Sequence, residues 1–244
     1  MAKKAAGVDM GVVRLNGVVL NPSGTQITNV VRPIPSMDAS FVDVGGDGEL
    51  LKSAALRNPT IEFDIWLLGT TSTERRDQIR ELSKKLAIKK ARSLKFSDDG
   101  TKYYWVVRDG DIVPQEFIDS AVMHVRLKSI YPWMVDEYQY FSSDEAFVPD
   151  GNYPGAIELR SPADITVDSN NQFAFGGLTF TLEDTAYRRL TEFNSEKRIA
   201  QFNGVNFAPY ATNAWPTLTP GSSRTISVTK GSASLQFRYQ PRWI

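Results

Sequence analysis

The sequence predicts a mainly β protein made of two β-sandwich domains, the first of which carries one long α-helix. Apolar residues alternate with polar ones over Thr60–Leu68 and Ser120–Lys128, which is typical of strands with one buried face. Between them, only Thr71 to about Ile88 has the spacing of a long amphipathic helix. Beyond about residue 150, short strand patterns recur between turn signals without a helical stripe.

The segment from Asn58 to Arg108 is interpreted as strand, helix, strand, strand. Thr71 and Glu74 have the spacing of a capping box, in which each residue satisfies a backbone N–H of the other. One narrow apolar stripe runs along the helix, which indicates that the helix lies against a sheet. The stripe consists of Ile79, Leu82 and Leu86, and the other faces are assigned Arg75, Arg76, Asp77, Arg80, Glu81, Lys84 and Lys85.

Several hairpins are expected in the first half. Ser93–Phe96 and Thr101–Val107 form one around a turn at Asp98–Gly100, and Asn16-Gly17 is typical of a tight turn within Gly11–Leu20. Two further extended segments are Thr25–Val31, expected beside the Gly11–Leu20 hairpin, and the short Ser40–Val44, which ends at Gly45–Gly48.

The boundary between the domains is placed near residue 150, giving domains 1–150 and 151–244. Residues 136–155 lack an apolar period and are rich in acidic residues and proline, as linkers are. The clearest strands of the second domain are Ala156–Leu159, Asp164–Val167, Leu178–Leu182, Ser195–Gln201, Arg224–Val228 and Ser234–Tyr239.

The composition argues against most catalytic chemistry. The chain has no Cys and a single histidine, His124, on the outer face of a strand, so we expect no catalytic residue, no metal ligand and no cofactor. Gly45–Glu49 lacks the Lys-Ser/Thr of a P-loop and the acidic spacing of an EF-hand, so it is interpreted as a turn. No run approaches the ~20 apolar residues of a membrane span, and no apolar core follows the lysines near the start, so we expect a protein that neither inserts into membranes nor carries an export signal.

Two surfaces leave alternatives open. Arg75 to Arg92 contains eight basic and two acidic residues; we favour a solvated face or protein interface over nucleic-acid binding, because the helix pairs its charges as ordinary helix surfaces do. In the second domain Phe207, Tyr210, Trp215 and Trp243 are candidates for a sugar-stacking surface, or for aromatic side chains that fill the core.

The order of these parts resembles the distal tail proteins of siphophages. The resemblance spans the chain, and its most diagnostic part is the C-terminal run of Trp-Pro and Pro-Gly turns before a last strand pair ending in Arg-Trp. It is carried by Val44–Gly48, Leu94–Phe96, Tyr131–Trp133, Glu196–Gly204, Trp215–Gly221 and Phe237–Trp243. It implies that the second domain is galectin-like, or jelly-roll-like. The chain is too short to contain the carbohydrate-binding modules that some members insert.

The resemblance also implies a function. It predicts a non-enzymatic virion protein, assembled in the host bacterial cytoplasm and located at the distal end of the tail. There a homo-oligomeric, hexameric ring of first domains would join the tail tube protein to the tail-tip hub protein and to receptor-binding proteins. Outward aromatics such as Trp66 and Trp105 would make the ring contacts. The alternative from another class is a carbohydrate-binding module or host-surface adhesin that acts through the second sandwich.

Overall fold

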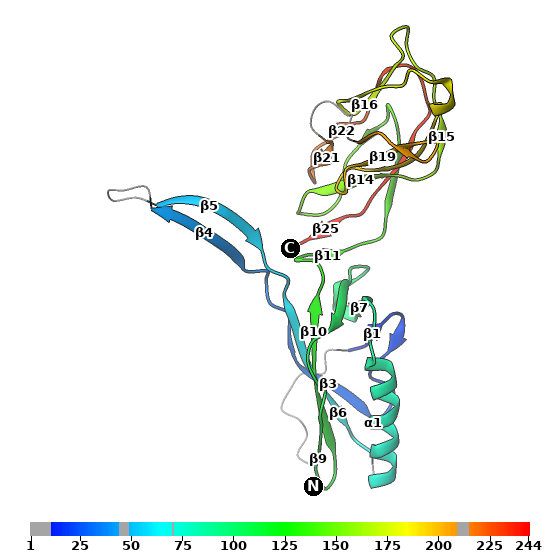
Figure 1. Cartoon of the computed structure of the whole chain (residues 1–244). Helices are drawn as coiled ribbons and strands as arrows, with labels where there is room; N and C mark the ends of the chain where they lie inside the picture. The colour runs from blue at the N-terminus through cyan, green and yellow to red at the C-terminus, as the bar shows by residue number, and fades with distance from the viewer. Residues whose placement is uncertain (1–10, 44–48, 70, 209–214) are drawn as a thin grey trace. The chain divides into compact units, whose positions relative to one another are not determined.

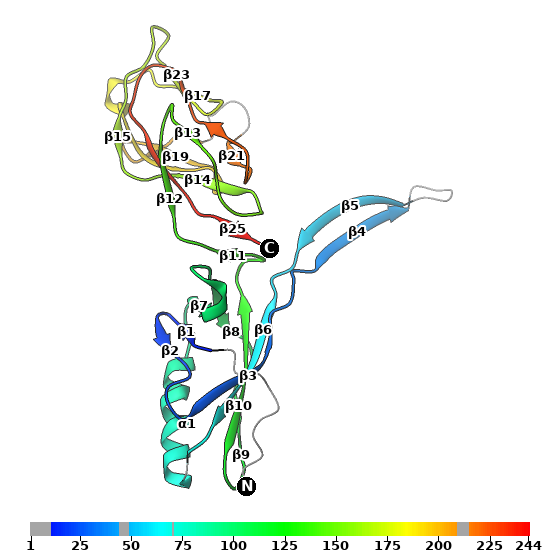
Figure 2. The same ribbon diagram turned by 180° about the vertical axis from the view of Figure 1, so that it is seen from behind.

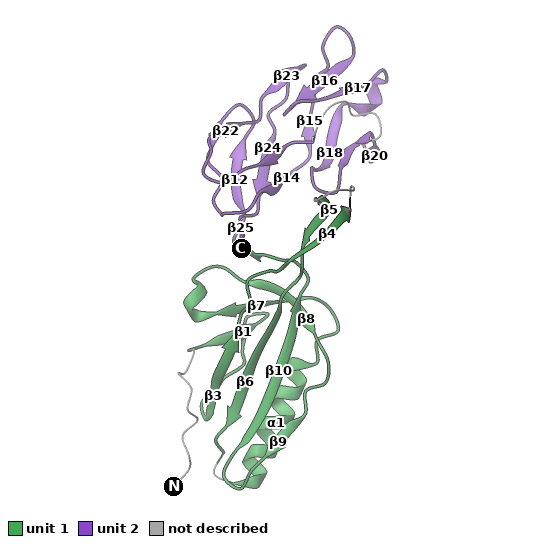
Figure 3. Ribbon diagram, turned by 90° about the vertical axis from the view of Figure 1, so that its left-hand side faces the viewer, with its two compact units in different colours: residues 1–135, 244 green, residues 136–243 purple. Residues whose placement is uncertain are grey.

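The computed structural model describes residues 11–43, 49–69, 71–208 and 215–244. The chain forms two compact units, residues 1–135 with Ile244 and residues 136–243 (Figure 3). Both are built almost entirely of antiparallel strands, and the described residues contain one α-helix, so the predicted mainly β class is confirmed.

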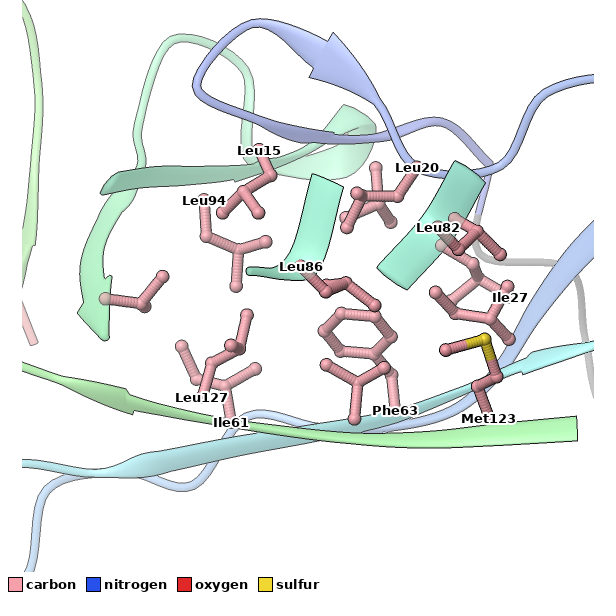
Figure 4. Packing of buried hydrophobic residues seen from close by; sticks show 14 of the residues in the cluster. Leu15, Leu20, Ile27, Ile61, Phe63, Leu82, Leu86, Leu94, Met123 and Leu127 are labelled. Atoms are coloured by element: carbon pink, nitrogen blue, oxygen red, sulfur yellow. The ribbon is translucent and has the colours of Figure 1, made fainter. Parts of the chain in front are cut away.

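Unit 1 contains an eight-stranded sheet in the order β2-β1-β7-β8-β10-β6-β3, with β9 paired to β10. The sheet folds over itself, so that residues of β1 and β7 meet residues of β6 and β10 across a shared core (Figure 4). Its strands are β1 (Val13–Leu15), β2 (Val18–Val19), β3 (Thr25–Val31), β6 (Thr60–Leu67), β7 (Arg92–Phe96), β8 (Tyr104–Arg108), β9 (Pro114–Glu116) and β10 (Ala121–Ser129); β11 (Met134–Val135) and a short 3-10 turn, η1 (Ser97–Asp99), complete the unit.

The central pair β6–β10 shows why the alternation in the sequence was informative. Phe63 lies opposite Val125 and Ile65 opposite Met123, and all four side chains are buried. The intervening residues point to the other face, where the charged side chains of the two strands meet. The period of two therefore places one face of each strand in the core.

Helix α1 (Ser72–Leu86) lies on this core, as expected. Its N-cap is Thr71, whose hydroxyl accepts from the Glu74 N–H at 3.2 Å while the Glu74 carboxylate accepts from the Thr71 N–H at 3.0 Å. Leu82 and Leu86 point into the core beside Phe63 (Figure 4).

The prediction that Arg75 lies on an outer face of the helix is wrong, because this residue is only 6% exposed. It lies four residues before Ile79, and therefore on the same helix stripe as Ile79, Leu82 and Leu86. Its guanidinium donates to the carbonyl oxygens of Gly69 at 3.0 Å and Ile118 at 2.8 Å. Position on the helix, rather than charge, decides its burial.

Two of the expected hairpins are present. Asn16 and Gly17, with φ of 50° and 80°, make the turn between β1 and β2, and β7 pairs with β8. The expectation that Thr25–Val31 lies beside the first hairpin is wrong. This segment is β3, which pairs with β6 at the opposite end of the sheet from β2.

The segment expected as a short extended piece is a full hairpin. β4 (Met37–Asp43) pairs with β5 (Glu49–Leu56) along its length, with one irregularity between Ser40 and Phe41. We call β4 and β5 the arm. Figures 1 and 2 show the arm continuing beyond β3 and β6 as a separate two-stranded ribbon. The predicted turn at Gly45–Gly48 lies outside the described residues.

Unit 2 is all β, as predicted. One sheet has the order β12-β24-β14-β18-β19-β20, with β15 paired to β18 and β21 to β14; a second has the order β17-β16-β23, and β13 pairs with β22. Its core is rich in phenylalanine, including Phe173, Phe175, Phe193 and Phe237. The strands are β12 (Gln139–Ser142), β13 (Ala146–Phe147), β14 (Gly155–Leu159), β15 (Ala163–Asp164), β16 (Gln172–Phe175), β17 (Leu178–Thr181), β18 (Arg189–Asn194), β19 (Ile199–Phe202), β20 (Val205–Asn206), β21 (Thr217–Leu218), β22 (Arg224–Thr225), β23 (Val228–Lys230), β24 (Gln236–Tyr239) and β25 (Arg242–Trp243), with a 3-10 turn η2 (Thr185–Tyr187).

The division between the units falls after Val135, whereas the sequence places it near residue 150. Strands β12 and β13 lie in the polar segment between these points, and β12 pairs with β24 near the end of the chain. Further along, the Pro149 carbonyl accepts from the Gly221 N–H at 3.0 Å, and the Asp150 carbonyl from the Tyr239 hydroxyl at 3.1 Å. Residues 136–155 have the composition of a linker, but they form strands and loops whose hydrogen-bond partners are distant in the sequence.

Candidate assembly surfaces

The arm presents apolar side chains to solvent. Two-stranded hairpins are marginally stable on their own, and an exposed apolar patch commonly marks an interaction site. The arm therefore has the properties of a surface that is completed by a partner. Its exposed large apolar residues are Met37, Phe41, Val42, Leu50 and Leu51.

Side chains hold the root of the arm at two points, and a backbone bond from the Ser129 N–H to the Pro59 carbonyl at 2.9 Å holds the returning chain as well. On the outgoing chain, the Arg32 guanidinium donates to both oxygens of Asp98, at 2.6 and 3.2 Å, and to Asp99 at 2.8 Å. The same guanidinium lies 4.8 Å from the ring centre of the buried Phe96. On the returning chain, the Asn58 side-chain amide donates to the Ile130 carbonyl at 3.1 Å.

A second apolar patch lies at the β9–β10 turn. Ile118 is 91% exposed, Phe117 is half exposed, and Leu68, which follows the partner of Ala121 on β6, is also exposed. Phe117 stacks on Trp66, with ring centres 6.1 Å apart. We call these residues the tip patch; the bond from Arg75 to the Ile118 carbonyl fixes its backbone.

The two tryptophans expected to point outward are half-buried. The Trp66 indole N–H donates to the Thr28 hydroxyl at 3.1 Å, and Trp105 packs edge-on against Tyr103 at 5.8 Å. Part of each ring is therefore covered by its own chain, and the more exposed apolar surfaces of unit 1 are the arm and the tip patch.

His124 lies on the outer face of the sheet, as the alternation predicts. Its Nδ1 is 2.8 Å from a carboxylate oxygen of Asp64, its cross-strand neighbour, and the next pair along the strands joins Arg126 to Glu62 at 2.9 Å. These contacts are cross-strand polar pairs on an exposed face. Within the described ranges, no three His, Asp or Glu side chains come together as a metal site requires.

The basic helix pairs its charges locally. Asp77 binds Arg80 at 2.9 Å, and Glu81 binds Lys84 at 3.1 Å. Lys85 donates to the Val19 carbonyl at 3.2 Å. The charged residues that line the hollow of about 480 Å³ beside this helix are three carboxylates, Glu74, Asp77 and Glu81, and one amine, Lys85, so the hollow is poorly suited to a phosphate backbone.

The predicted aromatic candidates of unit 2 lie mostly against its core. Trp215 stacks on Phe193 with ring centres 5.5 Å apart, and Phe207 packs edge-on against Phe202 at 5.5 Å. Trp243 is half-buried in β25. Tyr210 lies outside the described residues.

Sequence reasoning missed the surfaces that stand out most in the structure. The apolar residues of β4 and β5 flank a glycine-rich stretch of sequence, which is a hairpin signal, but whether they are exposed depends on the fold. Arg32 gives no local signal, because Asp98 and Asp99 are 66 and 67 residues away.

These observations define a two-unit, mainly β protein whose first unit carries an exposed apolar arm. No helix among the described residues is both long and apolar enough to cross a membrane. No family model matches the sequence, and no curated protein matches it.

Solved structures do match the fold. The Dit protein (gp 19.1) of SPP1, described as a paradigm of the hub adsorption apparatus in phages that infect Gram-positive hosts, is 15% identical with a TM-score of 0.67; the match covers 94% of this chain and 98% of that one. Phage p2 baseplate structures in the activated conformation, with Sr and with Ca, match 88% of this chain and 90% of theirs, with TM-scores of 0.43 and 0.44 and identities of 10% and 9%. This chain therefore has the Dit fold, which confirms the resemblance to distal tail proteins at the level of the fold.

Proposed function

We propose that this chain is a structural component of a phage virion, a distal tail adaptor that closes into a ring, expected to be hexameric. The ring would join the tail tube to the tail-tip hub and, through the hub region, to receptor-binding proteins. The location would be the distal end of the tail. The role is structural rather than catalytic.

The observation that carries the proposal is the exposed arm on a chain with the Dit fold. A ring forms when a head-to-tail interface has a rotation that closes, which requires two different surfaces on each copy. The arm supplies one such surface. Burying a leucine such as Leu50 or Leu51 contributes about 1.5–3 kcal/mol, so a few of these side chains can decide whether copies associate.

Light scattering coupled to size exclusion, followed by negative-stain microscopy, tests the proposal. We expect closed rings from the protein alone or mixed with its tail-tube and hub partners. Leu50→Ser combined with Leu51→Ser should abolish them. Val148→Ser combined with Val205→Ser is the matched control, because these exposed apolar residues lie in unit 2.

Two outcomes would contradict the proposal. One is a protein that stays monomeric alone and with both partners. The other is a Leu50/Leu51 variant that forms rings as readily as the Val148/Val205 control.

A further inference from the structure

The arm leaves unit 1 through two short connections, and each has one side-chain tether. Residues 32–36 lead from β3 into β4, and residues 57–59 lead back from β5 into β6. The connections are joined to each other by the bond from the Arg57 N–H to the Ser36 carbonyl at 2.8 Å. The direction of the arm therefore depends on what holds these connections against the rest of the unit.

Arg32 is the stronger tether. Its planar fork makes three charge-assisted hydrogen bonds to Asp98 and Asp99, and the guanidinium covers the face of Phe96. On the returning connection, Asn58 makes one neutral hydrogen bond, and the Pro59 carbonyl accepts one from the Ser129 backbone N–H at 2.9 Å. Pro33 and Pro35 follow in the outgoing connection, and because each proline fixes its own φ, this connection has fewer rotatable backbone bonds.

The contacts of Arg32 differ from those of an ordinary surface ion pair. The Arg32 side chain is 22% exposed, whereas that of Arg57, which pairs with Asp38 within the arm, is 65% exposed. The hydrogen bond from Arg32 holds the pKa of the Asp98 carboxyl below its ordinary value, so this carboxylate stays charged. Asp98 and Asp99 belong to η1, which follows directly on β7, and are thereby fixed to the sheet.

We propose that Arg32 is a positioning residue that fixes the direction of the arm by clamping its root to Asp98, Asp99 and Phe96. The inference deepens the proposed function, because it assumes that the arm is the surface on which copies associate. A clamped arm meets its partner already oriented, so association does not have to order it.

The absence of cysteine in the chain allows a direct test on the full-length protein. Lys52→Cys on β5 and Ser83→Cys on α1 place one spin label on the arm and one on the helix, both at exposed positions. Pulsed electron–electron double resonance, at a concentration where the protein is monomeric, then gives the distribution of distances between the two spin labels. Arg32→Met should broaden this distribution at least twofold, whereas Arg57→Met, the matched control, should leave it unchanged.

Asp98→Asn provides a second route, because it weakens the clamp but leaves Arg32 over Phe96; we expect intermediate broadening. Circular dichroism confirms that each variant is folded. Equally narrow distributions for wild type, Arg32→Met and Asp98→Asn would overturn the inference.

Ring assembly is measured separately on the unlabelled proteins. If the wild type forms no rings with its partners, the proposed function fails, while the distance distributions still decide the role of Arg32. If the wild type forms rings, Arg32→Met should assemble at least tenfold less than Arg57→Met. Equal assembly would show that the direction set by Arg32 does not matter.

Discussion

The Arg75 guanidinium donates to the Ile118 carbonyl at 2.8 Å, which joins the first turn of α1 to the β9–β10 turn 43 residues later. The same side chain donates to the Gly69 carbonyl. Arg75, which the sequence pattern places on the surface of the helix, thus connects α1, the segment before it at Gly69 and the β9–β10 turn. It also fixes the backbone of the tip patch.

Arg75→Met should destabilise the protein. The substitution removes two hydrogen bonds from a charged donor and leaves two carbonyls without that partner; hydrogen bonds to charged groups contribute about 1.5–3 kcal/mol each. For the two bonds together we expect a loss of about 3–6 kcal/mol in urea unfolding. Arg76→Met, next to it but exposed, should change stability by less than about 0.5 kcal/mol. Equal effects at the two positions would contradict the bonds described for Arg75.

The helix cap gives a second prediction. Thr71→Ala removes the acceptor for the Glu74 N–H and should cost about 1 kcal/mol. Thr73→Ala, two residues further along on the exposed side of the helix, is the control and should be neutral or slightly stabilising, because alanine is the better helix former. Thermal melting of both variants measures the difference. A Thr71→Ala variant as stable as the control would mean that the capping box contributes nothing.

The sequence could predict the parts of the fold that depend on local patterns. The β6 alternation, the Thr71–Glu74 box and the Asn16-Gly17 turn each involve residues close together in the chain, and all three are confirmed. It could not predict the features made by distant residues. β12 pairs with a strand almost 100 positions later, and the partner of β3 depends on the order of the whole sheet.

The same limit applies to the candidate surfaces. The sequence suggested Trp66 as an outward aromatic for assembly contacts and Trp215 as a candidate for sugar stacking, yet both are partly covered by neighbours that only the fold brings together. The exposed residues of the arm are no more apolar than buried ones. Exposure of an apolar side chain is a property of the fold, so sequence alone could not distinguish an assembly surface from a core strand.

Tyr104 makes stability depend on pH in the alkaline range. Burial, followed by the nearby charge of Asp99, raises the pKa of Tyr104 to about 12. Since the folded state holds the proton more tightly than the unfolded state, whose pKa is near 10, the stabilisation is complete below pH 10 and is lost as pH rises towards 12. Chemical unfolding at pH 9 to 12 should show this loss.

Tyr104→Phe isolates the contribution of Tyr104. Burial also raises the pKa of Tyr239, so the informative quantity is the difference between wild type and Tyr104→Phe. Wild type should lose stability relative to this variant as pH rises. Parallel curves for the two proteins would show that Tyr104 ionises as easily in the folded state as in the unfolded chain.

The position of the boundary between the units is the last prediction. We expect residues 1–135 to fold alone and to keep the capacity to form rings, and residues 136–244 to fold as a monomeric sandwich. A cut after residue 150 should leave the second fragment less stable, because it removes β12, and with it Phe141, which lies against Phe237 with ring centres 5.5 Å apart. Removing a phenylalanine side chain from a core typically costs about 3–5 kcal/mol, so residues 151–244 should melt well below residues 136–244.

Amide dispersion in NMR, thermal melting and sedimentation of the separate fragments measure folding, stability and association. If fragment 151–244 is as stable as fragment 136–244, β12 does not belong to the second fold; if only the second unit associates, the arm is not the assembly surface.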